Sequence, residues 1–341
     1  MSTSPVPSML DLVRLSPKRL FPPGGVDLYR QIALLTEMRE GLEVLDVAAG
    51  KGVPLEYFAS EFGVNGSGVE IDPGMVEEAD SWSRDTGAGG RIQFQTGRSD
   101  ALPYRDEIFD IAIGEIGLAN HCDPAHAVQE LVRVTKPGGF VVLVQLVWKA
   151  PVEEPRRTVL ADHLGAKPMM VVEWKRILKE AGVLDVHVED WSDEETAFRP
   201  TVVKPFPDFA EMFGLMERMA ILRRAWSRWG WRGVSTAIAR ESEVHKLLTN
   251  ERILGLDLLR GRKAPLPDDE TRADGSAHEG ADAATAGPRP PEEGVEETPR
   301  PASVAALPHP ADPPGDERGD EPDRAETEGL PLFGDNQGDD G

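Results

Sequence analysis

The stretch VLDVAAGKGVP, residues 44–54, begins as an apolar strand and ends in small residues and glycines. Asp46 lies near the end of the apolar run, and Gly50 and Gly52 follow it closely. Glycines adopt backbone angles that other residues avoid, and they leave the main chain open to close approach. The next helix, predicted to start near Pro54, would direct its amino-terminal N–H groups at the same place. The stretch therefore predicts a ligand site at the carboxyl end of a buried strand.

Strand and helix patterns alternate along the chain from about residue 26 to residue 263. Continuous apolar segments such as FDIAIGEI and FVVLVQLVW favour buried strands, whereas VDLYRQIALLTEMRE has apolar residues at helical spacing. This alternation predicts an α/β fold, with a mostly parallel sheet covered by helices on both faces. Residues 205–250 look helical and precede the last predicted strand, 252–263. We interpret this helical stretch as an insertion before that strand rather than as a separate domain.

The charge of the chain is concentrated at its end. The 341 residues carry a formal charge of −23, and the segment from Pro265 onward, with 21 Asp/Glu and 5 Arg, accounts for −16 of it. Because this segment is rich in Pro, Gly and Glu and has little to bury, we predict that residues 264–341 form a disordered acidic tail. The single cysteine excludes an internal disulfide and a cysteine-based zinc site. The longest apolar run has nine residues and no leader pattern opens the chain, so we expect a cytoplasmic protein with no membrane partner.

A second acidic residue follows the next predicted strand. The segment GVEID places Glu70 24 residues after Asp46. A carboxylate at this position can accept hydrogen bonds from both hydroxyls of a ribose. Asp46 would repel a phosphate but accept hydrogen bonds from an ammonium group. The two carboxylates and the glycines therefore favour an amine-bearing nucleoside without phosphates, which describes S-adenosylmethionine better than a dinucleotide.

Four segments carry a resemblance to a known family: VLDVAAGKG, GVEIDPGMVEEA, TGRSDALPYRDEIFDIAIGEIGL and ELVRVTKPGGFVVLVQ. In this order they resemble the motifs of class I S-adenosylmethionine-dependent methyltransferases, especially the subset of ubiquinone- and menaquinone-biosynthesis-type and other small-molecule enzymes. The resemblance covers about residues 22–263. It implies a doubly wound, seven-stranded, Rossmann-like methyltransferase fold. It also implies S-adenosylmethionine as cofactor and S-adenosylhomocysteine as product.

The resemblance also implies a role for each motif residue. The first motif would hold the methionine moiety, the acid of the second motif would bind the ribose, and the third motif would contact the adenine edge. The cofactor-binding positions that the resemblance implies are Asp46, Ala48, Gly50, Gly52, Glu70, Ile71, Met75, Ser99, Asp100, Ala101 and Glu115. Two positions depart from the family pattern. Ala48 replaces a usual glycine, and Arg98 stands where an adenine-binding aspartate is common. Either Asp100 or the backbone of Ser99 would then hold the adenine.

Glu115 and His121 are the candidate catalytic residues. Glu115 follows the fourth strand and would lie beside the methionine end, where it contacts cofactor or acceptor or simply bonds loop N–H groups. A histidine such as His121 can accept a proton near neutral pH, although loop histidines are more often packing residues. No pattern indicates a metal site. An acid or base is needed only for a protonated acceptor, because the sulfonium is already a strong electrophile.

Three hypotheses follow for the function. The first is in-line methyl transfer to a small molecule, with a helical lid at about 200–250 and residues 1–21 as a further pocket cover. The second is a scaffold or regulatory protein that binds the cofactor without turnover. The third, a nucleic-acid methyltransferase, is opposed by the net acidity, because phosphate binding needs a positive field. Residues 199–246 contain nine Arg/Lys and five Asp/Glu, which indicates a solvated face, a surface for an anionic acceptor or a docking face for the acidic tail.

Overall fold

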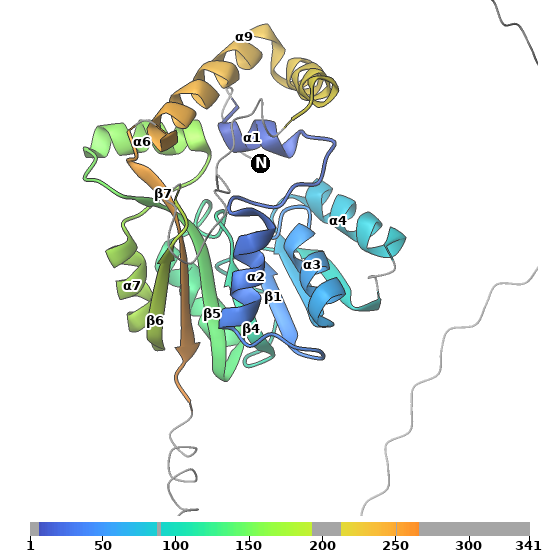
Figure 1. Cartoon of the computed structure of the whole chain (residues 1–341), viewed down its shortest axis with the longest axis vertical. Helices are drawn as coiled ribbons and strands as arrows, with labels where there is room; N and C mark the ends of the chain where they lie inside the picture. The colour runs from blue at the N-terminus through green and yellow to red at the C-terminus, as the bar shows by residue number, and fades with distance from the viewer. Residues whose placement is uncertain (1–6, 87–89, 193–212, 250, 266–341) are drawn as a thin grey trace, which may run out of the picture. The chain divides into compact units, whose positions relative to one another are not determined.

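The fold is described from a computed structural model, in which residues 7–86, 90–192, 213–249 and 251–265 are described. Its centre is a seven-stranded sheet with the strand order β3-β2-β1-β4-β5-β7-β6 (Figure 1). The first five strands pair in parallel, and β7 pairs antiparallel with both β5 and β6. The strands are β1 (Glu43–Val47), β2 (Asn65–Glu70), β3 (Ile92–Thr96), β4 (Phe109–Gly114), β5 (Thr135–Trp148), β6 (Val183–Asp190) and β7 (Leu254–Lys263). The predicted doubly wound, mostly parallel seven-stranded sheet is confirmed.

Helices cover both faces of the sheet, as the continuous apolar strands require. One core lies under α2 (Gly25–Leu35), α3 (Val53–Phe62) and α4 (Pro73–Asp85). The other lies under α5 (Pro124–Val134) and α7 (Val171–Glu180), where Trp174 is fully buried. Neighbouring residues of a strand point to opposite cores. Accordingly, Val44 belongs to the first core and Leu45 to the second.

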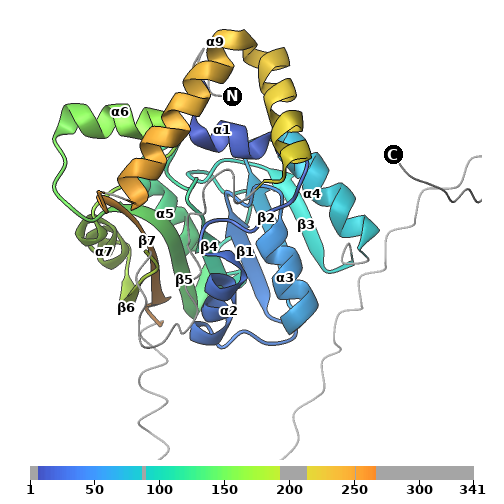
Figure 2. The ribbon, with the colours of Figure 1, turned by 45° about the horizontal axis from the view of Figure 1, so that its top comes forward.

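Three further helices lie beyond the carboxyl ends of the parallel strands (Figures 1 and 2). They are α1 (Met9–Arg14), α6 (Glu154–Leu164) and α9 (Leu215–Thr249). The sequence predicted helical structure at α9 but neither α1 nor α6, because α1 has only six residues and α6 is mostly polar and charged. Gly230, with a φ of 68°, breaks α9 into two arms. The predicted insertion before the last strand is thus present.

Helix α1 packs against α9 through a small apolar cluster. Leu12 is buried with Ala225 and Val234, and the guanidinium of Arg224 donates a hydrogen bond of 2.8 Å to the Leu15 carbonyl. In both ribbon views α1 lies between α9 and the sheet. The contacts therefore link the N-terminal segment to the helical insertion.

Some predictions concern residues that the structure does not describe. The acidic tail, apart from its first two residues, lies outside the described residues, as do residues 193–212 at the start of the predicted lid. Among the helices that are described, none combines the length and apolar character needed to cross a bilayer.

Candidate active site

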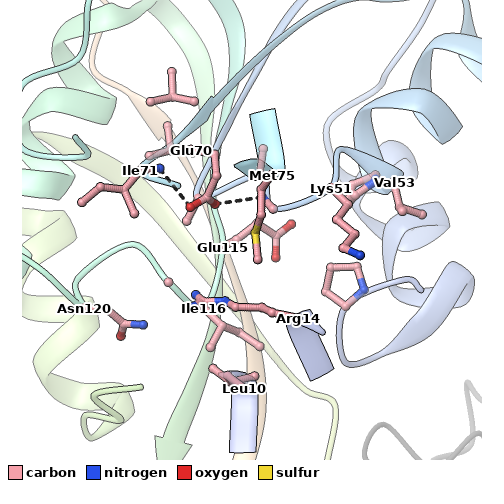
Figure 3. A pocket seen from close by; sticks show the side chains of 18 of the residues that line it. Leu10, Arg14, Lys51, Val53, Glu70, Ile71, Met75, Glu115, Ile116 and Asn120 are labelled. Carbon is pink, nitrogen blue, oxygen red and sulfur yellow. Dashed lines mark hydrogen bonds between the residues drawn. The ribbon is translucent and has the colours of Figure 1, made fainter. Parts of the chain in front are cut away.

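A cavity of about 450 Å³ opens where β1, β2 and β4 end. Its floor is formed by the loop after β1, by Glu70 at the end of β2 and by the loop that begins at Glu115 after β4. The N-terminal segment supplies an apolar wall that includes Leu10, Leu20 and Phe21. Figure 3 shows the carboxylate of Glu70 in this pocket with its hydrogen bonds. The cavity lies at the sheet edge that the first motif predicted.

Glycine is suited to the two positions of the first motif, Gly50 and Gly52, for different physical reasons. Gly52 has a φ of 72°, and a Cβ added there would lie 2.2 Å from the ring of Phe94, so packing requires a glycine. Gly50 has a φ of 55°, but a Cβ there would meet nothing within 4 Å. Ala48 also adopts a positive φ, 63°, a conformation that costs an alanine about 1 kcal/mol. The loop thus leaves open main chain at Gly50.

Glu70 accepts hydrogen bonds from three backbone amides. Its Oε2 accepts from the amide of Gly50 at 3.0 Å, and its Oε1 accepts from the amides of Ile71 and Asp72 at 2.9 and 3.1 Å. The residue is only 5% exposed, and its side chain lines the cavity. These bonds hold the carboxylate between the loop after β1 and the start of α4. Each of its two oxygens keeps further lone pairs for a ligand hydroxyl.

A second acidic group lies below the loop. The hydroxyl of Tyr29, on α2, donates to both carboxylate oxygens of Glu115 at 2.8 and 2.9 Å. The amide of Gln145 donates to the Glu115 carbonyl at 2.8 Å. Asp46 is fully buried beside this pair, and among the described residues neither of its carboxylate oxygens has a hydrogen-bond partner. A buried carboxyl without a partner is costly, which is a physical reason to expect a cationic or donor group near it.

Burial changes the protonation of these acids. It raises the pKa of Glu115 to about 7, and the hydrogen bond from Tyr29 partly opposes this rise. Burial also raises the pKa of Asp46 well above its ordinary value, and the charges of Glu115 and Glu70 raise it further. Carboxyl groups this close disfavour each other's ionisation. The cluster therefore retains protons at a pH where exposed carboxyl groups have lost them.

The third motif forms an ion pair. Arg98 donates from Nε and Nη2 to the two oxygens of Asp100, both at 2.8 Å, and the pairing lowers the pKa of Asp100. The hydroxyl of Ser99 donates to the Leu118 carbonyl at 2.6 Å. The side chains of Ser99 and Asp100 thus already have protein partners. The positive charge of Arg98 offsets the negative charge of Asp100. An aspartate without such a partner would keep its full negative charge.

His121 lies at the other end of the cavity. Burial lowers its pKa, and the positive charges of Arg14, Lys167 and Arg98 lower it further. The imidazole is therefore neutral at pH 7, the form that accepts a proton.

The structure brings most of the predicted site residues to this cavity. Those that line it are Ala48, Gly50, Glu70, Ile71, Met75, Ser99, Asp100, Glu115 and His121. Asp46, Gly52 and Ala101 are not among the lining residues: Asp46 lies beneath the floor, and Ala101 is exposed. Sequence reasoning missed Tyr29, whose place in an apolar helix pattern gave no signal of a polar role.

The N-terminal segment is held across the first motif by Lys51. Its ammonium group donates to the Ser16 carbonyl at 2.8 Å and pairs with Glu78 at 2.8 Å. Arg19 likewise donates to the Lys51 carbonyl at 2.7 Å. These contacts explain how residues far from the motif reach the cavity, which local patterns do not reveal.

Residues 45–143 match the family model described as a methyltransferase domain. This part of the chain is similar to methyltransferase domains. A demethylmenaquinone methyltransferase of Renibacterium salmoninarum is 36% identical over 124 residues, which cover 36% of this chain and 48% of that protein. A ubiquinone/menaquinone biosynthesis C-methyltransferase of Idiomarina loihiensis is 32% identical over 110 residues, covering 32% of this chain and 44% of the other. The chain spans about half the length of these curated relatives.

Solved structures share the fold of this chain over most of its length. The crystal structure of the [4+2]-cyclase SpnF has a TM-score of 0.57 and 26% identity, and the match covers 70% of this chain and 81% of that one. The phosphoethanolamine N-methyltransferase 2 of Haemonchus contortus, solved with S-adenosyl-L-methionine, has a TM-score of 0.57 and 16% identity. This second match covers 75% of this chain and 57% of the other, and it shows the fold alone.

Proposed function

We propose that this protein transfers the methyl group of S-adenosylmethionine to a small-molecule acceptor by direct in-line displacement. The observation that carries the proposal is the acidic cavity, in which Glu70 and Glu115 lie near the buried, unpartnered Asp46. When bound, the cofactor supplies an electrophilic methyl group on a positively charged sulfur. A bound cation favours the ionised form of nearby carboxyl groups, so the cofactor and the buried acids Glu115 and Asp46 would stabilise each other's charge.

The lining residues also fit the uncharged parts of the cofactor. Glu70 has lone pairs for the ribose hydroxyls, and Ile71 and Met75 offer apolar surface for the adenine. Three of the four Lys and Arg residues that line the cavity are paired: Lys51 with Glu78, Arg98 with Asp100, and Arg14 with Asp11. A phosphate-bearing nucleotide would have to compete with these carboxylates. The site therefore favours the amino-acid nucleoside.

The protein contributes mainly by position and by exclusion of water. The apolar wall from Leu10 to Phe21, together with α9 above α1, would cover the cavity as a lid. For an acceptor that carries a proton, a ring nitrogen of the neutral His121 would receive it. Glu115, hydrogen bonded by Tyr29, would orient the methionine end.

The test is incubation of the purified protein with methyl-labelled S-adenosylmethionine and an extract of small metabolites. We expect label in a low-molecular-mass product together with S-adenosylhomocysteine. The Glu70→Ala variant should lose this transfer, whereas Glu77→Ala, at an exposed position on α4, should keep it. Tight cofactor binding without transfer in broad extracts would reject the proposal.

A function without methyl transfer is the second candidate. The structure named a [4+2]-cyclase shares this fold at 26% identity, so the fold also serves a protein with another named reaction. A scaffold that binds the cofactor would likewise transfer no methyl group. Cofactor binding without S-adenosylhomocysteine formation, combined with a change in another metabolite, would favour a cyclase-like activity. Binding with no chemical change would favour the scaffold.

A further inference from the structure

A second cavity of about 850 Å³ adjoins the first. Six residues line both cavities and mark the junction between them: Arg14, Glu70, Ile71, Met75, Asn120 and His121. The second cavity is also lined by two aromatic side chains, Trp148 of β5 and Trp229 of α9. The second cavity therefore borders the cofactor site and also offers apolar surface to a second molecule.

The acids of the second cavity already have partners. Asp11 accepts from the hydroxyl of Ser8 at 2.8 Å, and Asp162 accepts from Arg240 at 2.8 Å. The remaining acids, apart from Glu154, are also engaged: Glu173 accepts from the Met170 amide, Glu78 pairs with Lys51, and Glu70 and Asp72 accept from backbone amides. Their charges are thus committed to holding the fold.

Several cations of the cavity are not committed in this way. Within the described ranges, neither Lys167 nor Arg228 forms an ion pair. In the part of the chain that the structure describes, the one acid near Arg157 is the largely exposed Glu154, at 4.0 Å, and the buried Nε of Arg157 has no hydrogen-bond partner there. A buried guanidinium N–H without an acceptor is costly, and an anionic group would supply that acceptor. The uncommitted charge of this cavity is therefore positive.

Several positive charges act on the His121 ring at the junction. The charges of Arg14, Lys167 and Arg98 all act on its ring, after burial, to lower its pKa. Glu70 lines both cavities and Asp72 lines the second, and each accepts hydrogen bonds from backbone amides. The second cavity thus places cations without a close ion-pair partner beside acids that already accept hydrogen bonds or ion pairs.

We propose that the second cavity is the acceptor site and that it takes an apolar molecule with an anionic group, held by Lys167 and Arg157. The apolar part would lie against Trp148 and Trp229, and the reacting end would reach the junction at His121. The inference rests on the proposed methyl transfer, because it assigns the acceptor of that reaction. Carboxylate, sulfonate and phosphate groups share the required chemistry.

A matched pair of fluorescent probes tests the charge preference. The probes are 1-anilino-8-naphthalenesulfonate and the neutral N-phenyl-1-naphthylamine, titrated with S-adenosylmethionine in excess so that the first cavity is filled. We expect Lys167→Ala and Arg157→Gln each to weaken binding of the sulfonate at least fivefold, and to change binding of the neutral probe less than twofold. Lys175→Ala removes an exposed lysine of α7 outside the cavity, so it should change neither probe. Circular dichroism and the Tm establish that each variant is folded.

Sulfonate binding that is unchanged in both folded variants, or equal losses for the two probes, would overturn the charge preference. If the protein fails to bind S-adenosylmethionine, that result counts against the proposed function, and the same titrations without cofactor still decide the charge preference.

Label transfer tests the assignment as acceptor site. The metabolite extract is first separated on an anion exchanger, and each fraction is incubated with the labelled cofactor. We expect methylated product from the retained, anionic fraction and a lower yield in the Lys167→Ala variant. Transfer confined to the unretained fraction would overturn the acceptor assignment while leaving methyl transfer itself established. Absence of transfer from every fraction would count against both.

Discussion

The Glu70 carboxylate accepts hydrogen bonds from three backbone amides and also lines the first cavity. Replacement by alanine removes the carboxylate that we propose binds the ribose, so we expect Glu70→Ala to weaken S-adenosylmethionine binding more than tenfold, at least about 1.4 kcal/mol. Calorimetry measures the affinity. Glu70→Gln keeps one oxygen for the amides and should fall between alanine and wild type, whereas Glu77→Ala should match wild type. An unaltered Kd in Glu70→Ala would contradict the ribose role.

Glu115 makes the stability of the fold depend on pH. Its pKa in the folded protein, about 7, lies above its ordinary value of 4.5. The folded state therefore binds a proton that the unfolded chain has lost between these values, and the unfolding free energy decreases as the pH rises through this window. The loss is on the order of 3 kcal/mol. Denaturant unfolding from pH 4.5 to 8 should show a weaker decrease in Glu115→Gln, whereas Glu61→Gln, at an exposed position, should follow wild type.

Gly50 and Gly52 should respond differently to the same substitution. Gly50→Ala meets no atom, so it should cost only the positive φ, about 1 kcal/mol, but its methyl group narrows the cofactor site. Gly52→Ala adds an overlap with the Phe94 ring and should cost about 2–4 kcal/mol. Denaturant unfolding measures the loss of stability in each variant, and calorimetry measures the affinity for S-adenosylmethionine. Equal losses of stability in the two variants would contradict this account of the loop.

Helix α1 is the element whose contacts bear on the proposed lid. Leu12 is 3% exposed and packs on α9, whereas Leu34 of α2 is 66% exposed. We expect Leu12→Ala to loosen α1 and to raise the dissociation rate of S-adenosylmethionine at least threefold in stopped-flow measurements, because α1 lines the cavity. Leu34→Ala makes the same truncation without losing a buried contact and should leave the rate unchanged. Equal rates in the two variants would argue against a covering role for α1.

The elements of the sheet and its covering helices follow sequence patterns closely, whereas α1 and α6 do not. Apolar runs such as those of β4 and β5 have one stable arrangement, buried between two helix layers. Helix α6 buries only Leu160 and Leu164 and is otherwise polar, so no apolar face indicates it. Its position, like that of α1, depends on contacts with the distant α9.

For the whole molecule, the acidic tail remains a prediction from composition. Removal of residues 266–341 takes away most of the net negative charge but few apolar side chains. We expect the truncated protein to keep its Tm within about 2 °C, a change of less than about 1 kcal/mol, and its affinity for S-adenosylmethionine within twofold. Differential scanning calorimetry at low and high salt measures the effect. A salt-dependent loss of stability on truncation would instead favour docking of the tail on residues 199–246, where Arg and Lys outnumber Asp and Glu.

The sequence by itself determined the α/β class, the strand that carries the site and the acidic and glycine positions at its end. It did so because strand burial and the βα turn are local properties of the chain. Only the tertiary structure decided that Tyr29 bonds Glu115, that Arg98 pairs with Asp100, and that the N-terminal segment walls the cavity. These contacts join residues from separate elements or depend on loop geometry, and their energies arise from burial and charge that no local pattern contains.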